Sequence, residues 1–251
     1  LDFSGRHIAV VGLGGTGAQA ARGIARVLYA MQLNGIRIPR LVLIDPCTLG
    51  LEARARAAHA GDVLDSAEIL TLEEVFSRSD LVIATTGEVS KSVCTPMRMP
   101  YFQPSEIRDI IADIDGRIAV LFGRENWGLN NDEIFRSDVI CTIPASADYP
   151  ILNLSHAVGI ICYEFSRLSR GDYLLASREE MDHLYAHIDS YLDKIDHPLF
   201  KRQPTMLLIR RVLGRTKLTA REASTLHGLM RRSEWHFNPA AFVRKKAQDE
   251  D

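Results

Sequence analysis

The chain has 251 residues, of which 46% are hydrophobic and 25% are charged, a composition typical of globular proteins. No apolar run approaches the roughly 20 residues that span a bilayer, and the four cysteines stand far apart without a C-x-x-C pair. These features argue against a membrane protein, a zinc site and a disulfide framework. We therefore expect a cytoplasmic protein that binds no metal.

The formal net charge of −2 conceals an uneven distribution along the chain. Residues 1–200 carry 18 Lys and Arg against 27 Asp and Glu, whereas residues 201–246 carry 12 against 2. A basic segment on an acidic body is expected of a nucleic-acid-binding protein. The alternative is a solvated helical tail that its arginines merely keep soluble. The side chains of this segment that we assign to RNA binding are Arg210, Arg211, Arg215, Lys217, Arg231 and Arg232.

Up to about residue 170, apolar runs alternate with helical patterns, which predicts an α/β domain whose parallel sheet is flanked by helices. We assign residues 1–170 to this domain. The expected strands are His7–Gly12, Arg40–Ile44, Leu81–Thr85, Arg117–Phe122 and Val139–Ile143. The expected helices are Gly17–Gln32, Leu51–Ala60, Thr71–Ser77, Pro104–Asp113, Asn130–Arg136 and Asn153–Leu168.

After a linker near residues 171–177, residues 177–246 predict a small basic α-helical module. Its first helix opens with the capping box Ser177-Arg-Glu-Glu180 and is broken at His197-Pro-Leu. A second capping box, Thr219-Ala-Arg-Glu222, opens another helix. Because this module holds the basic segment, we expect it to bind RNA.

The first expected strand leads into a glycine-rich turn, Gly12-Leu-Gly-Gly-Thr-Gly17, and Asp45 ends the next strand. A strand, a glycine turn, a helix, a strand and an acid in this order are the fingerprint of a dinucleotide-binding unit. Residues 5–46 resemble the start of an adenylating domain of the ThiF or ubiquitin-activating type. The Asn/Arg-rich stretch and the cysteine tetrad expected of such a domain do not follow in the sequence.

Two later segments, Leu121–Glu133 and Ile143–Val158, each lead from an apolar strand into a loop of Gly, Pro, Asn and Ser. Such loops present backbone N–H and C=O groups at the carboxyl ends of strands, where open α/β sheets bind ligands. In composition and order these two blocks, about 29 positions together, resemble the second and third signature motifs of the SPOUT RNA methyltransferases of the TrmJ type.

The resemblance implies a homodimer with a C-terminal trefoil knot that uses S-adenosylmethionine to methylate ribose 2′-hydroxyls of tRNA, with an anticodon-loop nucleotide as the target. The helix Asn153–Leu168 is then expected at the dimer interface. Backbone groups would hold most of the cofactor, and Glu125 would organise its loop. Arg124 would contact a phosphate or the partner subunit, or else form a structural ion pair. The residues assigned to the cofactor are Thr85, Thr86, Gly87, Leu121, Gly123, Glu125, Ile143, Pro144, Pro150, Ile151 and Leu152.

The first motif of the family departs most from this sequence. The family pattern Asn-x-Gly-x-x-x-Arg supplies an arginine that is thought to activate the ribose hydroxyl, which is a poor nucleophile at neutral pH. Here Arg22 and Arg26 lie on the corresponding helix without the Asn and Gly at that spacing. We name Arg26 first and Arg22 second as catalytic candidates, with solvent-facing arginines as the alternative. Asn153 resembles the asparagine of the third motif and completes the candidate catalytic set.

The leading hypothesis is therefore a tRNA ribose 2′-O-methyltransferase. One alternative is an adenylating or NAD-linked enzyme that acts through Gly12–Gly17 and Asp45, which predicts ATP or NAD binding that Asp45→Ala abolishes. Another is a catalytically silent RNA-binding dimer with the same fold, which predicts binding of tRNA without methyl transfer.

Overall fold

A computed structural model describes residues 8–13, 17–34, 40–44, 60–89, 96–124, 127–146, 151–166, 168 and 172–237. The chain divides into two compact units, Leu1–Leu175 and Ala176–Asp251. Several predicted features lie outside the described residues: Gly14 and Asp45 of the glycine fingerprint, Glu125, Pro150, and residues 51–59 of an expected helix. No helix of the described part is long and apolar enough to cross a membrane.

The described part of the first unit contains a seven-stranded sheet in the order β3-β2-β1-β6-β4-β7-β5. All recorded strand pairs are parallel, as predicted. The strands are β1 (Ile8–Leu13), β2 (Arg40–Ile44), β3 (Glu68–Ile69), β4 (Leu81–Thr85), β5 (Tyr101–Phe102), β6 (Ile118–Phe122) and β7 (Val139–Cys141). The five expected strands are confirmed, and the two-residue strands β3 and β5 are additions.

The order of the strands brings the later motifs together. Strand β6 enters the sheet between β1 and β4, and β7 enters between β4 and β5. The carboxyl ends of β6, β4 and β7 therefore lie side by side at one edge of the sheet, where ligands of parallel α/β proteins bind. Residues 147–150, which follow the end of β7, lie outside the described part, so the trefoil knot stays a prediction.

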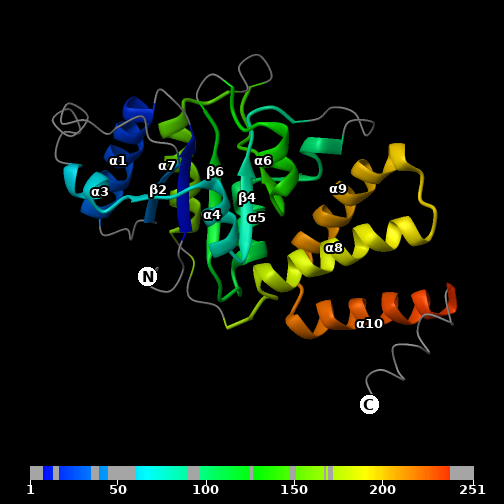
Figure 1. The fold of residues 1–251 in the computed structure, drawn as a ribbon. Coiled ribbons are helices and arrows are strands. Elements are labelled where there is room, and N and C mark those ends of the chain that lie inside the picture. The colour runs from blue at the N-terminus through cyan, green and yellow to red at the C-terminus, as the bar shows by residue number, and fades with distance from the viewer. Residues whose placement is uncertain are drawn as a thin grey trace. The chain divides into compact units, whose positions relative to one another are not determined.

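Helices cover both faces of the sheet (Figure 1). In this unit they are α1 (Gly17–Leu33), α3 (Gly61–Asp65), α4 (Leu72–Arg78), α5 (Pro104–Ile111), α6 (Asn131–Arg136), α7 (Leu154–Phe165) and the single-turn helix η1 (Pro96–Arg98). Helix α4 begins at Thr71, whose hydroxyl accepts from the backbone N–H of Glu74. Helix α6 begins in the same way at Asn130, with Glu133 as its partner. Each cap satisfies N–H groups that a helix end leaves unpaired.

The central strands read as continuous apolar runs because both faces of the sheet are buried. Ile118, Val120 and Phe122 of β6 face a core shared with α1, α5 and α7. Ala119 and Leu121 face a second core shared with α4 and α6. Helices α1 and α7 approach closely, since a Cβ added at Gly159 would lie 3.1 Å from Val27. This packing sets the position of α7 and hence of the loop before it.

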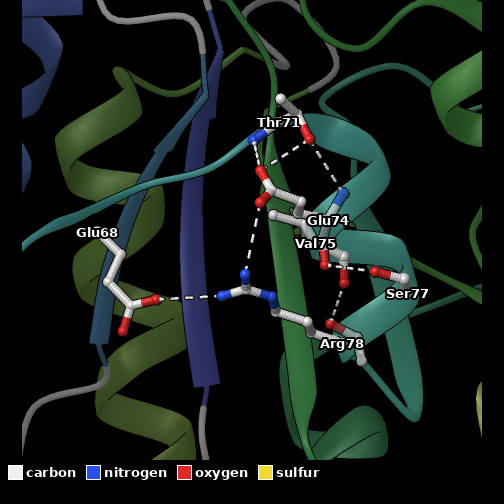
Figure 2. A network of polar contacts seen from close by, with 7 residues as sticks. Glu68, Thr71, Glu74, Val75, Ser77 and Arg78 are labelled. Carbon is white, nitrogen blue, oxygen red and sulfur yellow. Dashed lines mark hydrogen bonds and ion pairs between the residues drawn. The ribbon is translucent and has the colours of Figure 1, made fainter.

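Polar contacts anchor the short strand β3 to α4 (Figure 2). The guanidinium of Arg78 pairs with Glu74 on its own helix at 3.4 Å and approaches Glu68 of β3 at 3.9 Å. The same Glu74 accepts from the backbone N–H of Thr71 at 2.8 Å and so closes the capping box. Exposed ion pairs of this kind contribute little to stability, so we assign the network to positioning the edge of the sheet.

The second unit consists of α8 (Arg178–Lys194), α9 (Leu199–Arg215) and α10 (Ala220–Phe237). Both predicted capping boxes form, with Glu180 and Glu222 each accepting from the backbone N–H three residues earlier. The residues that share its core include Ala176, Met181, Leu184, Tyr185 and Ala223. Helix α9 was not predicted, because His197-Pro-Leu was interpreted only as the end of the preceding helix. Pro198 instead precedes the first residue of the helix, and Pro204 lies within it.

Candidate functional site

Hydrogen bonds join the carboxyl ends of the three central strands. The hydroxyl of Thr85, the last residue of β4, donates to the carbonyl oxygen of Leu121 in β6 at 2.8 Å. The backbone N–H of Thr86 donates to the carbonyl oxygen of Cys141 in β7 at 2.9 Å. The loops that leave these strands therefore start from one rigid platform.

A cleft of about 550 Å³ opens above this platform, which is within the range of roughly 300–1,000 Å³ found for small-molecule sites. Buried or half-buried apolar side chains such as Ile143, Leu152 and Ile161 line it together with the charged groups Glu88, Arg98 and Arg124. The residues that line it are Thr85, Thr86, Gly87, Glu88, Arg98, Phe122, Gly123, Arg124, Trp127, Gly128, Leu129, Cys141, Ile143, Ile151, Leu152, Asn153, Leu154, Ala157 and Ile161.

Gly123 has a steric role in this cleft. A Cβ at this position would lie 2.1 Å from the carbonyl carbon of Gly128 and 2.2 Å from the backbone nitrogen of Leu129. Real Cβ atoms essentially never come within 3.0 Å of another heavy atom, so only glycine fits. Two backbone segments thus meet at the end of β6, and their peptide groups are available to a ligand at close range.

The segment that packs on Gly123 is held as a tight hairpin. The N–H of Arg124 donates to the carbonyl oxygen of Gly128 at 3.1 Å, and the N–H of Gly128 donates to that of Arg124 at 2.7 Å. Gly128 adopts a φ of 65°, which side chains disfavour. The guanidinium of Arg124 pairs at 3.2 Å with Glu133, whose side chain is 3% exposed. This pair matches the structural alternative for Arg124, although the residue also lines the cleft.

Asn153 is the N-cap of α7. Its side-chain oxygen accepts from the backbone N–H of Ser155 at 3.0 Å and from the hydroxyl of Ser155 at 2.7 Å. Because these bonds fix the side chain beside the cleft, Asn153 holds the loop of Ile151 and Leu152 against the start of the helix. The carbonyl oxygen of its amide is therefore already engaged.

Sequence reasoning missed Arg98, which lies on η1 and lines the cleft. Its guanidinium donates to the hydroxyl of Thr86 at 3.1 Å and to the carbonyl oxygen of Glu88 at 3.4 Å. The carboxylate of Glu88 lies 3.9 Å away and is 70% exposed. Arg98 thus shapes the turn after β4 and adds positive charge to the cleft. No local motif distinguishes this arginine, since only the fold brings it to Thr86.

The cysteine of the cleft is not a nucleophile. Burial raises the pKa of the Cys141 thiol to about 12, so it stays protonated at neutral pH. The thiolate, which is the reactive form of cysteine, is therefore not populated. The cleft is suited to binding and orientation rather than to covalent catalysis by this residue.

Most of the residues predicted for the cofactor line this one cleft. Thr85, Thr86, Gly87, Gly123, Ile143, Ile151 and Leu152 do so. Leu121 is fully buried and contributes its carbonyl oxygen to Thr85 instead. Pro144 is exposed and is not among the lining residues. Glu125 and Pro150 lie outside the described part of the chain.

The two candidate catalytic arginines lie on α1. Arg26 is exposed and is not among the residues that line the cleft, while for Arg22 only the position on the helix is described. The helix nevertheless passes close to the site, because a Cβ at Gly23 would lie 3.2 Å from the Cβ of Ser155. Ser155 is two residues from Asn153. The structure thus brings α1 next to the start of α7, and Arg26 is not among the described residues of the cleft.

The predicted RNA-binding residues of the second unit differ in accessibility. Arg215, Arg231 and Arg232 are exposed, whereas Lys217 and Arg210 are half-buried. The guanidinium carbon of Arg210 lies 3.9 Å above the ring of Tyr185. Arg211 is only 2% exposed, so its prediction as an RNA contact is wrong: a phosphate cannot reach a buried guanidinium.

The charge of the second unit is also more balanced than that of the basic segment. Residues 176–251 carry 14 Lys and Arg against 11 Asp and Glu, because acidic residues of α8 belong to the same unit. Arg202 pairs with Asp189 and Asp193 of that helix. The prediction of nucleic-acid binding therefore depends on the exposed cations that the structure describes and not on the net charge alone.

Comparison with known proteins places these features in context. The model of the SpoU rRNA Methylase family matches residues 22–163, a range that includes every residue lining the cleft. A Methanocaldococcus jannaschii protein, tRNA (cytidine-2′-O-)-methyltransferase TrmJ, is 33% identical over 211 residues, which are 81% of this chain and 89% of that protein. The tRNA (cytidine/uridine/adenosine-2′-O-)-methyltransferase TrmJ of Pseudomonas aeruginosa is 29% identical over 83% of this chain and 86% of its own length.

A solved structure extends the similarity to the fold. The crystal structure of TrmJ from Z. mobilis ZM4 matches with a TM-score of 0.67 and 26% identity, covering 91% of this chain and 99% of that one. In this chain β1 and β2 belong to the same sheet as the strands whose ends meet at the cleft.

Proposed function

This chain belongs to the SpoU rRNA methylase family, and on that premise we propose that it transfers a methyl group from S-adenosylmethionine to a ribose 2′-hydroxyl of tRNA. The observation that carries the proposal is the cleft at the ends of β4, β6 and β7, which gathers the residues of both recognised motifs. The names of its relatives support tRNA as the substrate. We propose that the enzyme acts in the cytoplasm on a nucleotide of the anticodon loop.

The residues of the cleft fit S-adenosylmethionine. Its apolar side chains, which include Ile143, Leu152 and Ile161, suit an adenine ring, and the cleft volume of about 550 Å³ accommodates the cofactor. Gly123 removes the Cβ that would separate the ligand from the backbone of the hairpin. Arg98 supplies a cation opposite which a carboxylate group can lie.

When bound, the cofactor supplies an electrophilic methyl group, and the residues of this chain orient the two reactants. The rigid strand ends and the Asn153 cap fix the cofactor loops, which supplies the proximity that a transfer between two bound molecules requires. The 2′-hydroxyl must lose its proton as its oxygen bonds to the methyl carbon. Arg26, with Arg22 second, remains our candidate for lowering the barrier to that loss, because α1 lies against the start of α7.

We further propose that α7 forms a homodimer interface. Ile160 and Tyr163 of this helix are 39% and 49% exposed, and Ile151, at the cleft, is 53% exposed. Apolar side chains at such spacing form a stripe along a helix that favours burial against another protein surface. A second copy seated on α7 would place its own residues next to the cleft.

The exposed cations of the second unit are proposed to hold tRNA phosphates. Arg231 and Arg232 lie on α10 and Arg215 ends α9, and all three are exposed. Arginines donate several parallel N–H groups to phosphate oxygens, so a few such contacts suffice for orientation. This binding is expected to weaken steeply with salt.

Calorimetry against S-adenosylhomocysteine, ATP and NAD tests the proposal. Micromolar binding of S-adenosylhomocysteine alone supports the methyltransferase cleft. Binding of ATP or NAD alone would assign function to the Gly12–Gly17 turn and overturn the proposal. Binding of tRNA without any methyl transfer would instead indicate a catalytically silent RNA-binding protein. Gly123→Ala serves as the variant that should lose S-adenosylhomocysteine binding, with Gly61→Ala as its matched control.

A further inference from the structure

Trp127 is the most exposed large hydrophobic side chain that the structure describes, with 85% of its surface accessible. It also lines the cleft. An exposed tryptophan adds nothing to the core and leaves a large apolar surface in water, so its presence at a binding site indicates a contact with another molecule. The recognised motif contains Trp127 without assigning it a role.

The base of the hairpin that carries Trp127 is rigid. Reciprocal hydrogen bonds of 3.1 Å and 2.7 Å join Arg124 and Gly128, immediately after Trp127. The backbone of Gly128 packs on Gly123, and Arg124 is fixed by its ion pair with Glu133. The indole is thus presented from a fixed support, which reduces the conformational entropy lost when a flat ligand binds to it.

Two flat groups come near this ring if the proposed function holds: the adenine of the cofactor and a base of the RNA. The buried or half-buried apolar side chains Ile143, Leu152 and Ile161 already suit the adenine. Trp127 is largely exposed to solvent, where a macromolecular substrate arrives. These positions favour the RNA base.

We propose that Trp127 is a substrate-binding residue that stacks on an unpaired base of the tRNA loop during methyl transfer. The inference rests on the proposed function and deepens it, since it specifies single-stranded RNA at the cleft. Aromatic side chains bind splayed bases through their π-faces, whereas bases within a duplex stack on one another and are not available. The enzyme would therefore distinguish a loop from a stem by this contact.

Fluorescence provides a direct test, because the chain has only two tryptophans, Trp127 and Trp235. In a Trp235→Phe protein the emission reports Trp127 alone. We expect unfractionated tRNA to quench it, while a short RNA duplex quenches it much less and S-adenosylhomocysteine alone does not. Quenching by S-adenosylhomocysteine without RNA would show that the ring stacks on the cofactor and would overturn the proposal.

Steady-state kinetics supplies the second arm. Trp127→Ala is expected to lower kcat/KM for tRNA roughly 5- to 150-fold, the range of base–aromatic stacking. Trp127→Phe should retain most of the activity, and both variants should bind S-adenosylhomocysteine as the wild type does. Unchanged kcat/KM in Trp127→Ala overturns the stacking role, as does a change of oligomeric state in sedimentation, which would make Trp127 an interface residue.

Failure of the two proposals is distinguishable. A wild-type protein that neither binds S-adenosylhomocysteine nor methylates tRNA refutes the proposed function and, with it, the stacking role in methyl transfer. A wild-type protein that does both, alongside a fully active Trp127→Ala variant, refutes only the inference about Trp127.

Discussion

The substitution Gly123→Ala tests the steric basis of the cleft. The added Cβ would lie 2.1 Å, 2.2 Å and 2.5 Å from three backbone atoms of Gly128 and Leu129, whereas ordinary contacts begin at 3.4 Å. The hairpin must therefore move by more than about 1 Å, which breaks the two hydrogen bonds between Arg124 and Gly128. Overpacking costs about 1–3 kcal/mol and each lost hydrogen bond about 0.5–1.5 kcal/mol. We expect the free energy of unfolding to fall by about 2–6 kcal/mol.

Urea unfolding measures this loss, and calorimetry with S-adenosylhomocysteine measures the accompanying loss of affinity, which we expect to exceed tenfold. Gly61→Ala makes the same chemical change at a position where no atom lies within 4 Å, so its stability should change by less than about 1 kcal/mol. Gly128→Ala, at a φ of 65°, should cost about 1–2 kcal/mol through backbone strain alone. A Gly123→Ala protein with wild-type stability and affinity would refute the reasoning.

Three further predictions follow from the cap, the exposed cations and a histidine pair. Asn153→Ala should destabilise the protein by about 1 kcal/mol through loss of the helix cap. Asn153→Asp keeps an acceptor oxygen and should retain the melting temperature of the wild type. Equal melting temperatures of the wild type and both variants would contradict the role of Asn153 as a cap. The double variant Arg231→Ala, Arg232→Ala should weaken tRNA binding and lower the slope of log K against log salt by about 1–2. Arg78→Ala, which removes an exposed arginine of the other unit, is the control. An equal loss of tRNA affinity in both variants would contradict a specific role for α10. Burial, followed by the charges of His187, His183 and Arg231, lowers the pKa of His227 below 6.5, so the folded state disfavours its protonation. Stability should therefore decline as the pH falls below about 6.5, and His227→Gln should reduce that decline. Urea unfolding of both proteins at pH 8 and pH 5.5 measures the decline, and an equal loss of stability in the two proteins would contradict the prediction.

The histidine prediction has a geometric basis. His187 and His227 face each other across α8 and α10 with their Nδ1 atoms 2.6 Å apart, so one ring must donate and the other accept. The opposite nitrogen of His187 lies 3.1 Å from Glu234, which also pairs with Lys194. Protonation of His227 removes its acceptor nitrogen and adds a positive charge close to His187, His183 and Arg231, which opposes the contact between the two rings.

The sequence predicted the sheet well where the physics is local. Strands β4 and β6 are continuous apolar runs because alternate residues enter two different cores, and such runs are recognisable without a structure. Strands β3 and β5 have two residues each and leave no periodic signal. Helix α9 escaped notice because proline is usually a breaker, yet Pro198 occupies the cap position, where the helix does not need its N–H.

The site was predictable only in part, because local sequence patterns mark the strand ends but do not show which distant residues the fold brings to them. Glycine and proline at strand ends mark backbone that approaches a ligand, and Thr85, Gly123 and Ile143 do line one cleft. Arg98 lines the cleft from the single-turn helix η1, which does not follow a predicted strand, so only the tertiary fold shows that this arginine belongs to the site. Charge alone also misassigned Arg211: it shares a buried helix face with Leu207 and Gly214, at spacings of four and three residues.

Transfer of tritium from methyl-labelled S-adenosylmethionine to unfractionated tRNA is the most direct test of the central claim. A 2′-O-methylated ribose cannot be cleaved by alkali at its 3′ phosphodiester, so the label should appear in alkali-resistant dinucleotides. Label in the bases, or no label despite measurable binding of S-adenosylhomocysteine and tRNA, would contradict the assignment as a ribose 2′-O-methyltransferase.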